Sequence, residues 1–580
     1  MKTTRVRSLV AGLFVVLFIS VPAYAKTDGP SPGLQQPIIR YDAIHHPVQG
    51  RFGMVVSQNN IATSVGIDVL ACGGNAVDAS VAMGFALAVT LPRAGNIGGS
   101  GFMLAHLATE QKTIALDYRS VAPLAASVEK FQKPDGSMDM DKLTFGPMAP
   151  AVPGTVAAMH LAWQRYGSLP WPDLLQPAHE LANEGIVVWH DLAGVLNKAS
   201  SVLAHHSPGS AYLKRGGEPW VAGDLLVQKD LAWSLAQIMQ HGAAAFYQGE
   251  LADRIVNAFA ESGGQISHAD LAAYKVKERK PVRTSYRGKQ VISMPPVSAG
   301  GVTLLQMLNM LEHFPLAGTG AGSAQSLHIL AETMKRAAAN RRTWLGDPDF
   351  VEVHIDGFIS KELGKKMAAE IDTQKASDVK TIKPEPVDRY ESRDTTQFTV
   401  MDRFGNAVSN TYTLGYSFGS GYVAKGTGIL FDNQMRNFTY GDGGKHPNAM
   451  QPGKRMLSTM SPTIVLDEKG KVLLVTGTPG GSRIINVLLQ VIVNTLDHGM
   501  NIAEATHQPR IHQGWREQTL YLERGMNPEV IKLLQAMGHE TELAQTMGSA
   551  QTITWREGQF YGAADPRRPN ALALGLNRAP

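Results

Sequence analysis

A threonine at a possible self-cleavage junction and a pair of glycines carry the clearest chemistry in this sequence. Residues 394–400 read Asp-Thr-Thr-Gln-Phe-Thr-Val, and residues 479–483 read Pro-Gly-Gly-Ser-Arg. A threonine hydroxyl is a weak nucleophile unless a base lies beside it. Its own α-amino group becomes that base once the preceding peptide bond is cut. Two backbone N–H groups, as at Gly480 and Gly481, can stabilise an oxyanion. The two motifs together predict a self-cleaving precursor in which Thr395 becomes the N-terminal nucleophile.

The first motif alone has a simpler interpretation, because Thr-Thr-Gln-Phe-Thr-Val is rich in β-branched residues and is typical of an ordinary strand. The rest of the chain favours the catalytic interpretation. From about residue 50 to residue 567 the sequence resembles the γ-glutamyltransferases, also called glutathione hydrolases, of the N-terminal-nucleophile hydrolase superfamily. The matching segments are GGNAVDA (73–79), AGNIGG (94–99), LDYR (116–119), MPP (294–296) with Gly300-Gly301, LGDPDF (345–350), LSTMSPT (457–463) and GAADPR (562–567).

This resemblance implies an enzyme that forms a γ-glutamyl ester at Thr395. Transfer of that group to water gives hydrolysis, and transfer to an amino acid or dipeptide gives transpeptidation. Glutathione and other γ-glutamyl compounds are the implied substrates. Self-cleavage between Asp394 and Thr395 would give a large subunit (26–394) and a small subunit (395–580), which the resemblance implies remain together as a heterodimer. The implied fold is α+β, a four-layer αββα sandwich formed by both fragments, and no cofactor is expected.

The resemblance also assigns roles to residues around the nucleophile. Thr413 matches the threonine that hydrogen-bonds the nucleophile. Arg119 matches the arginine that binds the α-carboxylate of the glutamyl group, a role suited to its forked guanidinium. Ser458 and Thr459 match paired hydroxyls that bind the same carboxylate, and Gln434 falls in a segment that faces the substrate. The alternatives are an ordinary strand threonine for Thr413 and a surface arginine for Arg119.

Two positions depart from the family pattern. Asn437 stands where an aspartate usually pairs with the α-ammonium of the substrate, and Gly415 stands where Asn or Glu is usual. An amide accepts a hydrogen bond from an ammonium but forms no ion pair. Charged hydrogen bonds contribute about 1.5–3 kcal/mol and neutral ones about 1 kcal/mol. A neutral pocket penalises substrates without the amine less, so a glutaryl-amide (cephalosporin-type) acylase is the alternative activity. A non-catalytic secreted binding protein of the same fold is a second alternative, which the intact Thr395 disfavours.

The N-terminus has the features of a secretory signal. Three basic residues precede an apolar run from residue 9 to residue 21, and Ala-Tyr-Ala at 23–25 is a small-x-small cleavage site. We expect residues 1–25 to be removed during export across the inner membrane. The mature protein would then be periplasmic or extracellular, with no stable membrane span. An uncleaved membrane anchor is the alternative.

Charge and cysteine content exclude several other functions. Residues 26–580 carry 51 basic and 50 acidic side chains, so nothing indicates a nucleic-acid partner. Cys72 is the only cysteine, so no intramolecular disulfide can form, and its position after an apolar stretch favours a small packed residue. The histidine pairs at 45–46 and 205–206 have no acids or cysteines clustered around them, so no metal site is expected. Gly-Gly-Ser-Gly at 98–101 lacks the ending of a phosphate loop, and tight backbone packing near the site is the preferred interpretation.

Hydrophobic patterns place the catalytic motifs on particular elements. Residues 395–402 and 407–414 read as two strands joined by a short Gly-Asn turn, which would put Thr413 beside Thr395. Residues 461–466 and 472–477 predict a second strand pair. Its end leads through the glycine pair into a helix over 484–496, where free N–H groups and the helix dipole favour negative charge.

Other parts of the chain alternate helical and strand patterns. The polar, proline-containing residues 372–393 predict a flexible approach to the cleavage site. Helices are expected over 62–72, 76–89, 302–311 and 324–336, and strands over 103–107 and 112–116.

Overall fold

A β-hairpin carries the predicted nucleophile, as expected from the sequence. Strand β10 (Asp394–Asp402) is followed by a short turn and returns as β11 (Ala407–Gly415). This hairpin is part of a computed structural model, which describes residues 43–382 and 394–580. The predicted signal peptide and residues 383–393 lie outside the described residues. No helix within the described residues is long and apolar enough to cross a membrane.

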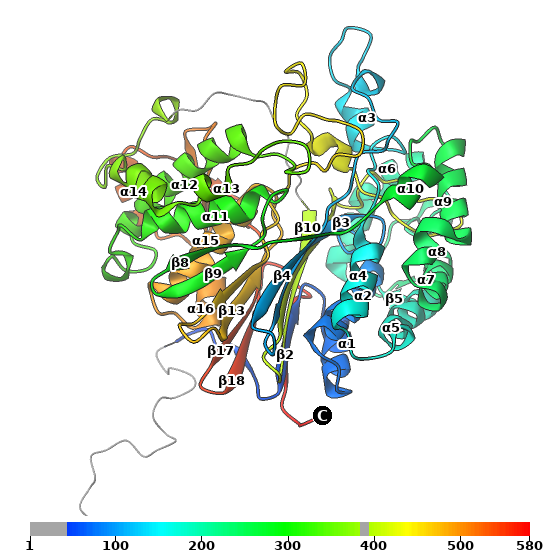
Figure 1. Cartoon of the computed structure of the whole chain (residues 1–580), viewed down its shortest axis with the longest axis horizontal. Coiled ribbons are helices and arrows are strands. Elements are labelled where there is room, and N and C mark those ends of the chain that lie inside the picture. Colours follow the sequence, from blue (N-terminus) through cyan, green and yellow to red (C-terminus); the bar gives the residue numbers. More distant parts are fainter. Residues whose placement is uncertain (1–42, 383–393) are drawn as a thin grey trace, which may run out of the picture. The chain divides into compact units, whose positions relative to one another are not determined.

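Two antiparallel seven-stranded sheets form the centre of the body that spans residues 45–580 (Figure 1). The first sheet has the order β19 (Leu572–Leu576), β2 (Gly53–Ser57), β10, β11, β3 (Ser100–Leu107), β4 (Lys112–Tyr118) and β7 (Lys277–Arg279). The second has the order β1 (Val48–Gly50), β18 (Gln559–Ala564), β17 (Gln551–Arg556), β13 (Val472–Gly477), β12 (Thr463–Leu466), β9 (Lys289–Ser293) and β8 (Val282–Tyr286). Both sheets contain strands from before and after Thr395, so the two predicted fragments share one fold.

Alternate residues of the first sheet face two different hydrophobic cores, because successive side chains of a strand point to opposite faces. Val55 and Met103 belong to a core with helices α1 and α2. Their neighbours Val56 and Phe102 belong to a second core, with the other sheet and helices α11, α12 and α15. Both faces of this sheet are therefore buried. The layers run helix, sheet, sheet, helix, which confirms the predicted αββα sandwich (Figure 1).

Helices cover the outer face of each sheet. The first group comprises α1 (Asn60–Ala71), α2 (Ala76–Thr90), α4 (Thr155–Tyr166), α5 (Trp171–Glu184), α6 (His190–His206), α7 (Lys229–His241), α8 (Ala243–Gln248), α9 (Glu250–Glu261) and α10 (His268–Ala273). The second comprises α11 (Ala299–Leu311), α12 (Ala324–Trp344), α13 (Ile355–Phe358), α14 (Lys361–Ala369), α15 (Arg483–Leu496), α16 (Ile502–His507) and α17 (Pro528–Ala536). Smaller elements are α3 (Met140–Thr144), a sheet of β14 (Ile511–Gln513), β15 (Thr519–Glu523) and β16 (Glu540–Ala544), and the pair β5 (Ile186–Val187) and β6 (Leu225–Leu226).

The predicted elements all form, with shifted ends. Helix α11 begins three residues earlier than predicted, because the side chain of Ser298 caps it by accepting a hydrogen bond from the N–H of Gly301. Helix α12 continues to Trp344, well past the predicted end at residue 336. The prediction that Cys72 is packed was wrong, since it is exposed at the C-terminal end of α1.

The segment leading to the predicted cleavage site is better anchored than its composition indicated. Ser377 donates its N–H to Glu332 at 3.1 Å and accepts a 2.8 Å hydrogen bond from Lys335 at its carbonyl. The indole N–H of Trp515 donates to the carbonyl of Ile382 at 2.9 Å. Hydrogen bonds to buried charged groups of α12 and to Trp515 therefore hold this part of the segment, residues 372–382, in the structure.

Candidate active site

Thr395 and Thr413 lie beside each other at the end of the hairpin. The hydroxyl of Thr395 donates a hydrogen bond to the hydroxyl of Thr413 at 3.2 Å, and both side chains are buried. A register shift between Asp394 and Thr396 places Thr395 at an irregularity of β10. The predicted contact between the two threonines is confirmed, while the role of Thr395 as nucleophile stays a prediction.

The backbone of Gly415 forms a hydrogen bond with the side chain of Thr413. Its N–H donates to Thr413 Oγ1 at 2.9 Å, which fixes the position of that hydroxyl. Gly415 has a φ of 97°, and a Cβ there would lie 2.0 Å from Oδ1 of Asn433. The position therefore has neither the conformation nor the space for the Asn or Glu that the family pattern led us to expect. Contact between Gly415 and the substrate stays a prediction.

A second glycine, Gly99, is required by close packing against the same threonine. A Cβ on Gly99 would lie 2.4 Å from the carbonyl oxygen of Thr413. The neighbouring Ser100 pairs with Thr413 across β3 and β11. The glycine-rich run therefore serves tight backbone packing at the site, as the sequence predicted.

Gly480 and Gly481 lie between β13 and α15, where the sequence placed them. Their φ angles are 136° and 59°, so both occupy the left-handed region that favours glycine. Within residues 43–382 and 394–580, neither N–H donates to a protein acceptor. The N–H groups of Arg483 and Ile484, at the start of α15, donate to the carbonyls of Gly480 and Gly481, each at 3.1 Å. Both glycine N–H groups are thus available to an oxyanion.

Arg119 is buried at the end of β4 rather than on the surface. Its guanidinium donates to the carbonyls of Met456 and Leu457 at 3.2 and 3.3 Å, and to the hydroxyl of Ser100 at 3.3 Å. These bonds use three of its five N–H groups. Burial lowers the pKa of Arg119 to about 10, while the charges of Asp432 and Asp117 oppose the shift. The side chain stays cationic at neutral pH, and the acceptors that it contacts among the described residues are neutral, which suits a binding site for a carboxylate.

Ser458 and Thr459 use their hydroxyls differently. Ser458 Oγ accepts a hydrogen bond from the N–H of Met460 at 3.2 Å, so its own hydrogen remains available to a ligand. The hydroxyl of Thr459 donates to the carbonyl of Gly481 at 2.8 Å. A hydroxyl has one hydrogen, so Thr459 in this position cannot also donate to a carboxylate. Thr459 therefore ties the serine–threonine segment to the glycine pair.

One side chain joins the segment beside Arg119 to the turn that contains Asn437. The amide of Asn448 donates to the carbonyl of Asn437 at 2.8 Å and accepts a 2.7 Å hydrogen bond from the N–H of Leu457. On the same 3₁₀ turn (Gln434–Asn437), the amide of Gln434 donates to the carbonyl of Thr413 at 3.3 Å. Hydrogen bonds thus connect Thr413, Arg119, Gln434 and Asn437.

Two carbonyl oxygens of this turn have no donor. Oε1 of Gln434 and Oδ1 of Asn437 are buried, and neither receives a hydrogen bond from the described part of the chain. Buried polar atoms without partners are uncommon and call for an explanation. Two such acceptors, on a turn linked by hydrogen bonds to the buried cation Arg119, fit a ligand that carries both an ammonium and a carboxylate.

The sequence reasoning missed Asp432, which lies buried beside Gln434. Its carboxylate accepts hydrogen bonds from the hydroxyl of Ser120 at 2.6 Å and from the N–H groups of Ala151 and Gln434 at 2.9 and 3.2 Å. Burial raises the pKa of Asp432 to about 6, although these bonds and the charge of Arg119 oppose the rise. Asp432 thereby positions the turn that carries Gln434. Asp432 lies two residues before Gln434, in the segment that the resemblance places facing the substrate, and this was the available signal.

A histidine cluster that the sequence did not suggest lies away from this site. His328, Glu332 and His539 offer atoms close enough together for a metal ion. However, the carboxylate of Glu332 already accepts from Lys335 and Arg336, each at 2.8 Å. A bound cation would lie next to two positive charges, so this cluster is a poor metal site.

Comparisons with known proteins agree with the geometry. The family model described as Gamma-glutamyltranspeptidase matches residues 62–575. A protein named glutathione hydrolase proenzyme from Escherichia coli (strain K12) is 46% identical over 542 residues, which cover 92% of this chain and 93% of that protein. An acylase ACY 1 proenzyme from Pseudomonas sp. (strain SE83) is 36% identical over 549 residues, covering 92% and 96%.

Solved structures with a similar fold also include a relative named as an acylase. The crystal structure of a cephalosporin acylase from Bacillus halodurans superposes with a TM-score of 0.83 at 27% identity, covering 94% of this chain and all of that chain. The relatives therefore include proteins named for both activities that the sequence left open.

Proposed function

The chain belongs to the gamma-glutamyltranspeptidase family, and we propose that it is a self-cleaving γ-glutamyltransferase and glutathione hydrolase with Thr395 as its nucleophile. The donor assignment rests on one arrangement. A buried cation, Arg119, is linked through Leu457 and Asn448 to the turn of Gln434 and Asn437, whose two buried carbonyl oxygens have no donor in the described part of the chain. The α-carboxylate and α-ammonium of a γ-glutamyl group supply the charges that these residues lack.

Maturation comes first in this proposal. The hydroxyl of Thr395 attacks the carbonyl carbon of Asp394, the peptide bond becomes an ester, and water cleaves the ester. The products are a new carboxylate at Asp394 and a free α-amine at Thr395. That amine is the base that the mature enzyme needs. The names of the relatives, which are proenzymes, support processing of this kind.

The mature enzyme then uses the same hydroxyl on the substrate. Thr395 Oγ1 attacks the γ-carbonyl of the donor while the α-amine takes its proton, and the amine half of the substrate leaves with that proton. The N–H groups of Gly480 and Gly481 stabilise the oxyanion of the tetrahedral intermediate. Water or the amine of an amino acid or dipeptide next attacks the γ-glutamyl ester, which regenerates Thr395. Thr413 holds the nucleophile in position through the 3.2 Å hydrogen bond.

A glutaryl-amide acylase is the second candidate. The observation that favours it is the neutral side chain of Asn437, because glutaryl donors lack the ammonium that a carboxylate there would require. Relatives named as acylases add support. The two buried acceptors without donors favour the γ-glutamyl donor instead, since a glutaryl group would leave both oxygens without partners.

The deciding experiment compares initial rates on matched γ-glutamyl and glutaryl p-nitroanilides with the purified, self-cleaved enzyme. We expect a higher kcat/KM for the γ-glutamyl compound. A higher kcat/KM for the glutaryl compound would replace the proposed activity by the acylase. Turnover of neither compound by a correctly cleaved protein would contradict both candidates.

The cellular location of the enzyme and the association of its subunits are part of the proposal. Removal of residues 1–25 after export would place the enzyme in the periplasm or outside the cell, where it would meet glutathione and other small γ-glutamyl compounds. The large and small subunits would stay together, because each contributes strands to both sheets. Fractionation of the native host, with the activity followed in each fraction, tests the location.

A further inference from the structure

The turn with two acceptors that lack donors also has a buried carboxylate at its start. Asp432 is fully buried and lies two residues before Gln434. Its Oδ1 accepts hydrogen bonds from the N–H groups of Ala151 and Gln434, and its Oδ2 accepts one from the hydroxyl of Ser120. An ionised carboxylate can accept about four hydrogen bonds, so these three donors do not saturate it. Asp432 therefore brings a negative charge to a place where two neutral side chains await donors.

Asp432 and Arg119 form a pair of opposite buried charges. The charge of Asp432 opposes the fall in the pKa of Arg119 that burial causes, and the charge of Arg119 opposes the rise in the pKa of Asp432. A γ-glutamyl donor carries the complementary pair, a carboxylate and an ammonium, so these four charges sum to zero. A glutaryl donor lacks the ammonium and would leave one negative charge in excess. A buried charge without a partner is costly, so ionised Asp432 favours the donor with the ammonium.

Other charged or titratable groups of this region do not distinguish the two donors. Asp117 already contacts Arg279 at 2.7 Å. The guanidinium of Arg436, on the same turn, lies 4.0 Å from the ring centroid of Tyr416. Burial raises the pKa of Tyr274, which is therefore neutral in the pH range of the enzyme. The charges of these groups are the same whichever donor is bound, so the difference between donors falls on Asp432.

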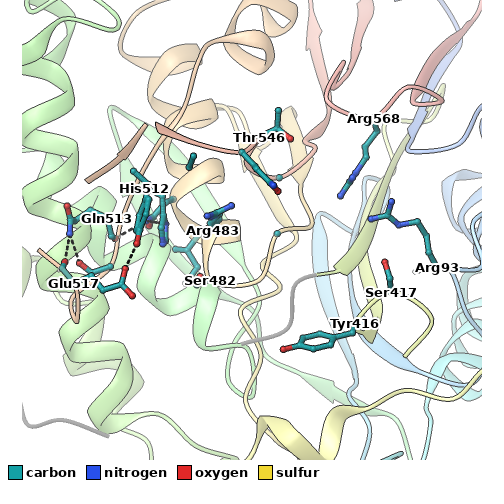
Figure 2. A pocket seen from close by; sticks show the side chains of 18 of the residues that line it. Arg93, Tyr416, Ser417, Ser482, Arg483, His512, Gln513, Glu517, Thr546 and Arg568 are labelled. Atoms are coloured by element: carbon teal, nitrogen blue, oxygen red, sulfur yellow. Dashed lines mark hydrogen bonds between the residues drawn. The ribbon is translucent and has the colours of Figure 1, made fainter. Parts of the chain in front are cut away.

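The cavity beside the predicted oxyanion site offers no better-placed carboxylate among the described residues. This cavity has a volume of about 1150 Å³, and its wall includes Arg93, Tyr416, Gly480, Arg483 and Arg568. Its carboxylates are Glu517 and Glu542. Figure 2 shows Glu517 across the cavity from Tyr416, which follows Gly415 on the side of the nucleophile. Asp432, by contrast, is hydrogen-bonded to the turn itself.

We propose that Asp432 is a specificity-determining residue, which supplies the negative charge for the α-ammonium of the donor where Asn437 cannot. The proposal rests on the proposed function, because only a γ-glutamyl donor brings an ammonium to this turn. Solvent screens buried charges weakly, so Asp432 can act on the ammonium while the carbonyl oxygens of Gln434 and Asn437 accept its hydrogen bonds. Asp432 therefore favours γ-glutamyl donors only while it is ionised.

The pH dependence of donor choice tests this role. Burial raises the pKa of Asp432 to about 6, so its charge is present at pH 7.5 and is lost as the pH falls to 5. We expect the ratio of kcat/KM for γ-glutamyl p-nitroanilide to that for glutaryl p-nitroanilide to fall by about tenfold between these values. Titration of the amine of Thr395 affects both donors alike and cancels in the ratio. The loss should appear in KM, because a bound ammonium lowers the pKa of Asp432 and keeps it ionised.

Three variants connect this change to Asp432. Asp432→Asn keeps the shape and an acceptor for both N–H donors, and its ratio should be about tenfold lower at pH 7.5 and independent of pH. Ser120→Ala removes a hydrogen bond that lowers the pKa of Asp432, so the midpoint of the change should move to higher pH. Asp356→Asn, at an exposed position of α13, is the control and should keep the wild-type profile.

The outcomes separate this proposal from the function on which it rests. A wild-type ratio that does not change with pH would overturn the role of Asp432. An unaltered pH dependence in Asp432→Asn would also overturn it and would assign the effect to another group, such as His446. If Asp432→Asn fails to fold or to self-cleave, an unmoved midpoint in Ser120→Ala would overturn the role instead. The proposed function survives these results, whereas turnover of neither compound by the correctly cleaved wild type would overturn both proposals.

Discussion

The hydroxyl of Thr459 donates a 2.8 Å hydrogen bond to the carbonyl oxygen of Gly481. This bond ties the segment that supports Arg119 to the loop whose N–H groups we assign to the oxyanion hole. Leu457, two residues earlier, accepts a hydrogen bond from Arg119. Hydrogen bonds therefore link the proposed binding site for the glutamyl carboxylate to the proposed oxyanion hole.

Loss of this bond should affect turnover more than binding. Thr459→Val removes the donor to Gly481 and leaves the loop less well positioned. Removal of one oxyanion donor typically costs about 10²–10³ in rate, so we expect a fall in kcat of about tenfold or more for a displaced donor. Thr459→Ser keeps the hydroxyl and should keep most of the activity. A rise in KM at normal kcat in Thr459→Val would instead mean that Thr459 binds the substrate carboxylate.

Asn437 should control the choice between donors with and without an α-ammonium. Asn437→Asp adds a carboxylate at a buried oxygen that has no donor, so it should lower KM for γ-glutamyl p-nitroanilide. Glutaryl p-nitroanilide should become a poorer substrate, because the new charge would stay unpaired. The kcat/KM ratio of the two donors should shift by about tenfold or more.

The exposed Asn577 provides the control for this substitution, and Asn577→Asp should leave the ratio unchanged. If Asn437→Asp also leaves it unchanged, Asn437 does not contact the ammonium.

Acid should destabilise the fold through His539. Burial, together with the charge of Lys335 and the neighbouring His328, lowers the pKa of His539 to about 4 from its ordinary value of 6.5. The unfolded chain therefore binds more protons than the folded chain between these values, and stability falls as pH drops from 6.5 to 4. One proton contributes a slope of at most about 1.4 kcal/mol per pH unit.

His539→Gln should flatten this slope in urea unfolding measured across that pH range. His354→Gln, at an exposed surface position, is the control and should retain the wild-type slope. Equal slopes for wild type and His539→Gln would show that His539 does not carry the effect.

Local patterns predicted the hairpin and the place of the glycine pair, because strand alternation and turn residues act over short distances, whereas the layered fold was implied by the family resemblance. The Thr395–Thr413 contact followed from the hairpin alone. Burial of Arg119 did not follow, since it depends on carbonyls more than 300 residues away in sequence. The link from Thr459 to Gly481 could not be predicted either, because it depends on which acceptor the hydroxyl of Thr459 meets in the folded chain.

The shared cavity of Arg93, Arg483 and Arg568 was equally hidden, because these residues are far apart in sequence and share no motif. Only the packing of α2, α15 and β18 brings their side chains to one cavity. The polar composition of residues 372–382 was misleading, because it indicated a loosely held segment. Its side chains and backbone contact buried charges of α12, so polarity there reflects anchoring and not disorder.

The identity of the nucleophile is tested most directly by the intact masses and N-terminal sequences of the purified protein. We predict two chains, residues 26–394 and 395–580, of about 40 and 20 kDa by proportion of the 62.5 kDa chain, with the smaller beginning at Thr395. Thr395→Ala should remain a single inactive chain. A wild-type protein that hydrolyses γ-glutamyl p-nitroanilide as an uncut chain, or a small fragment that begins at another residue, would contradict the account.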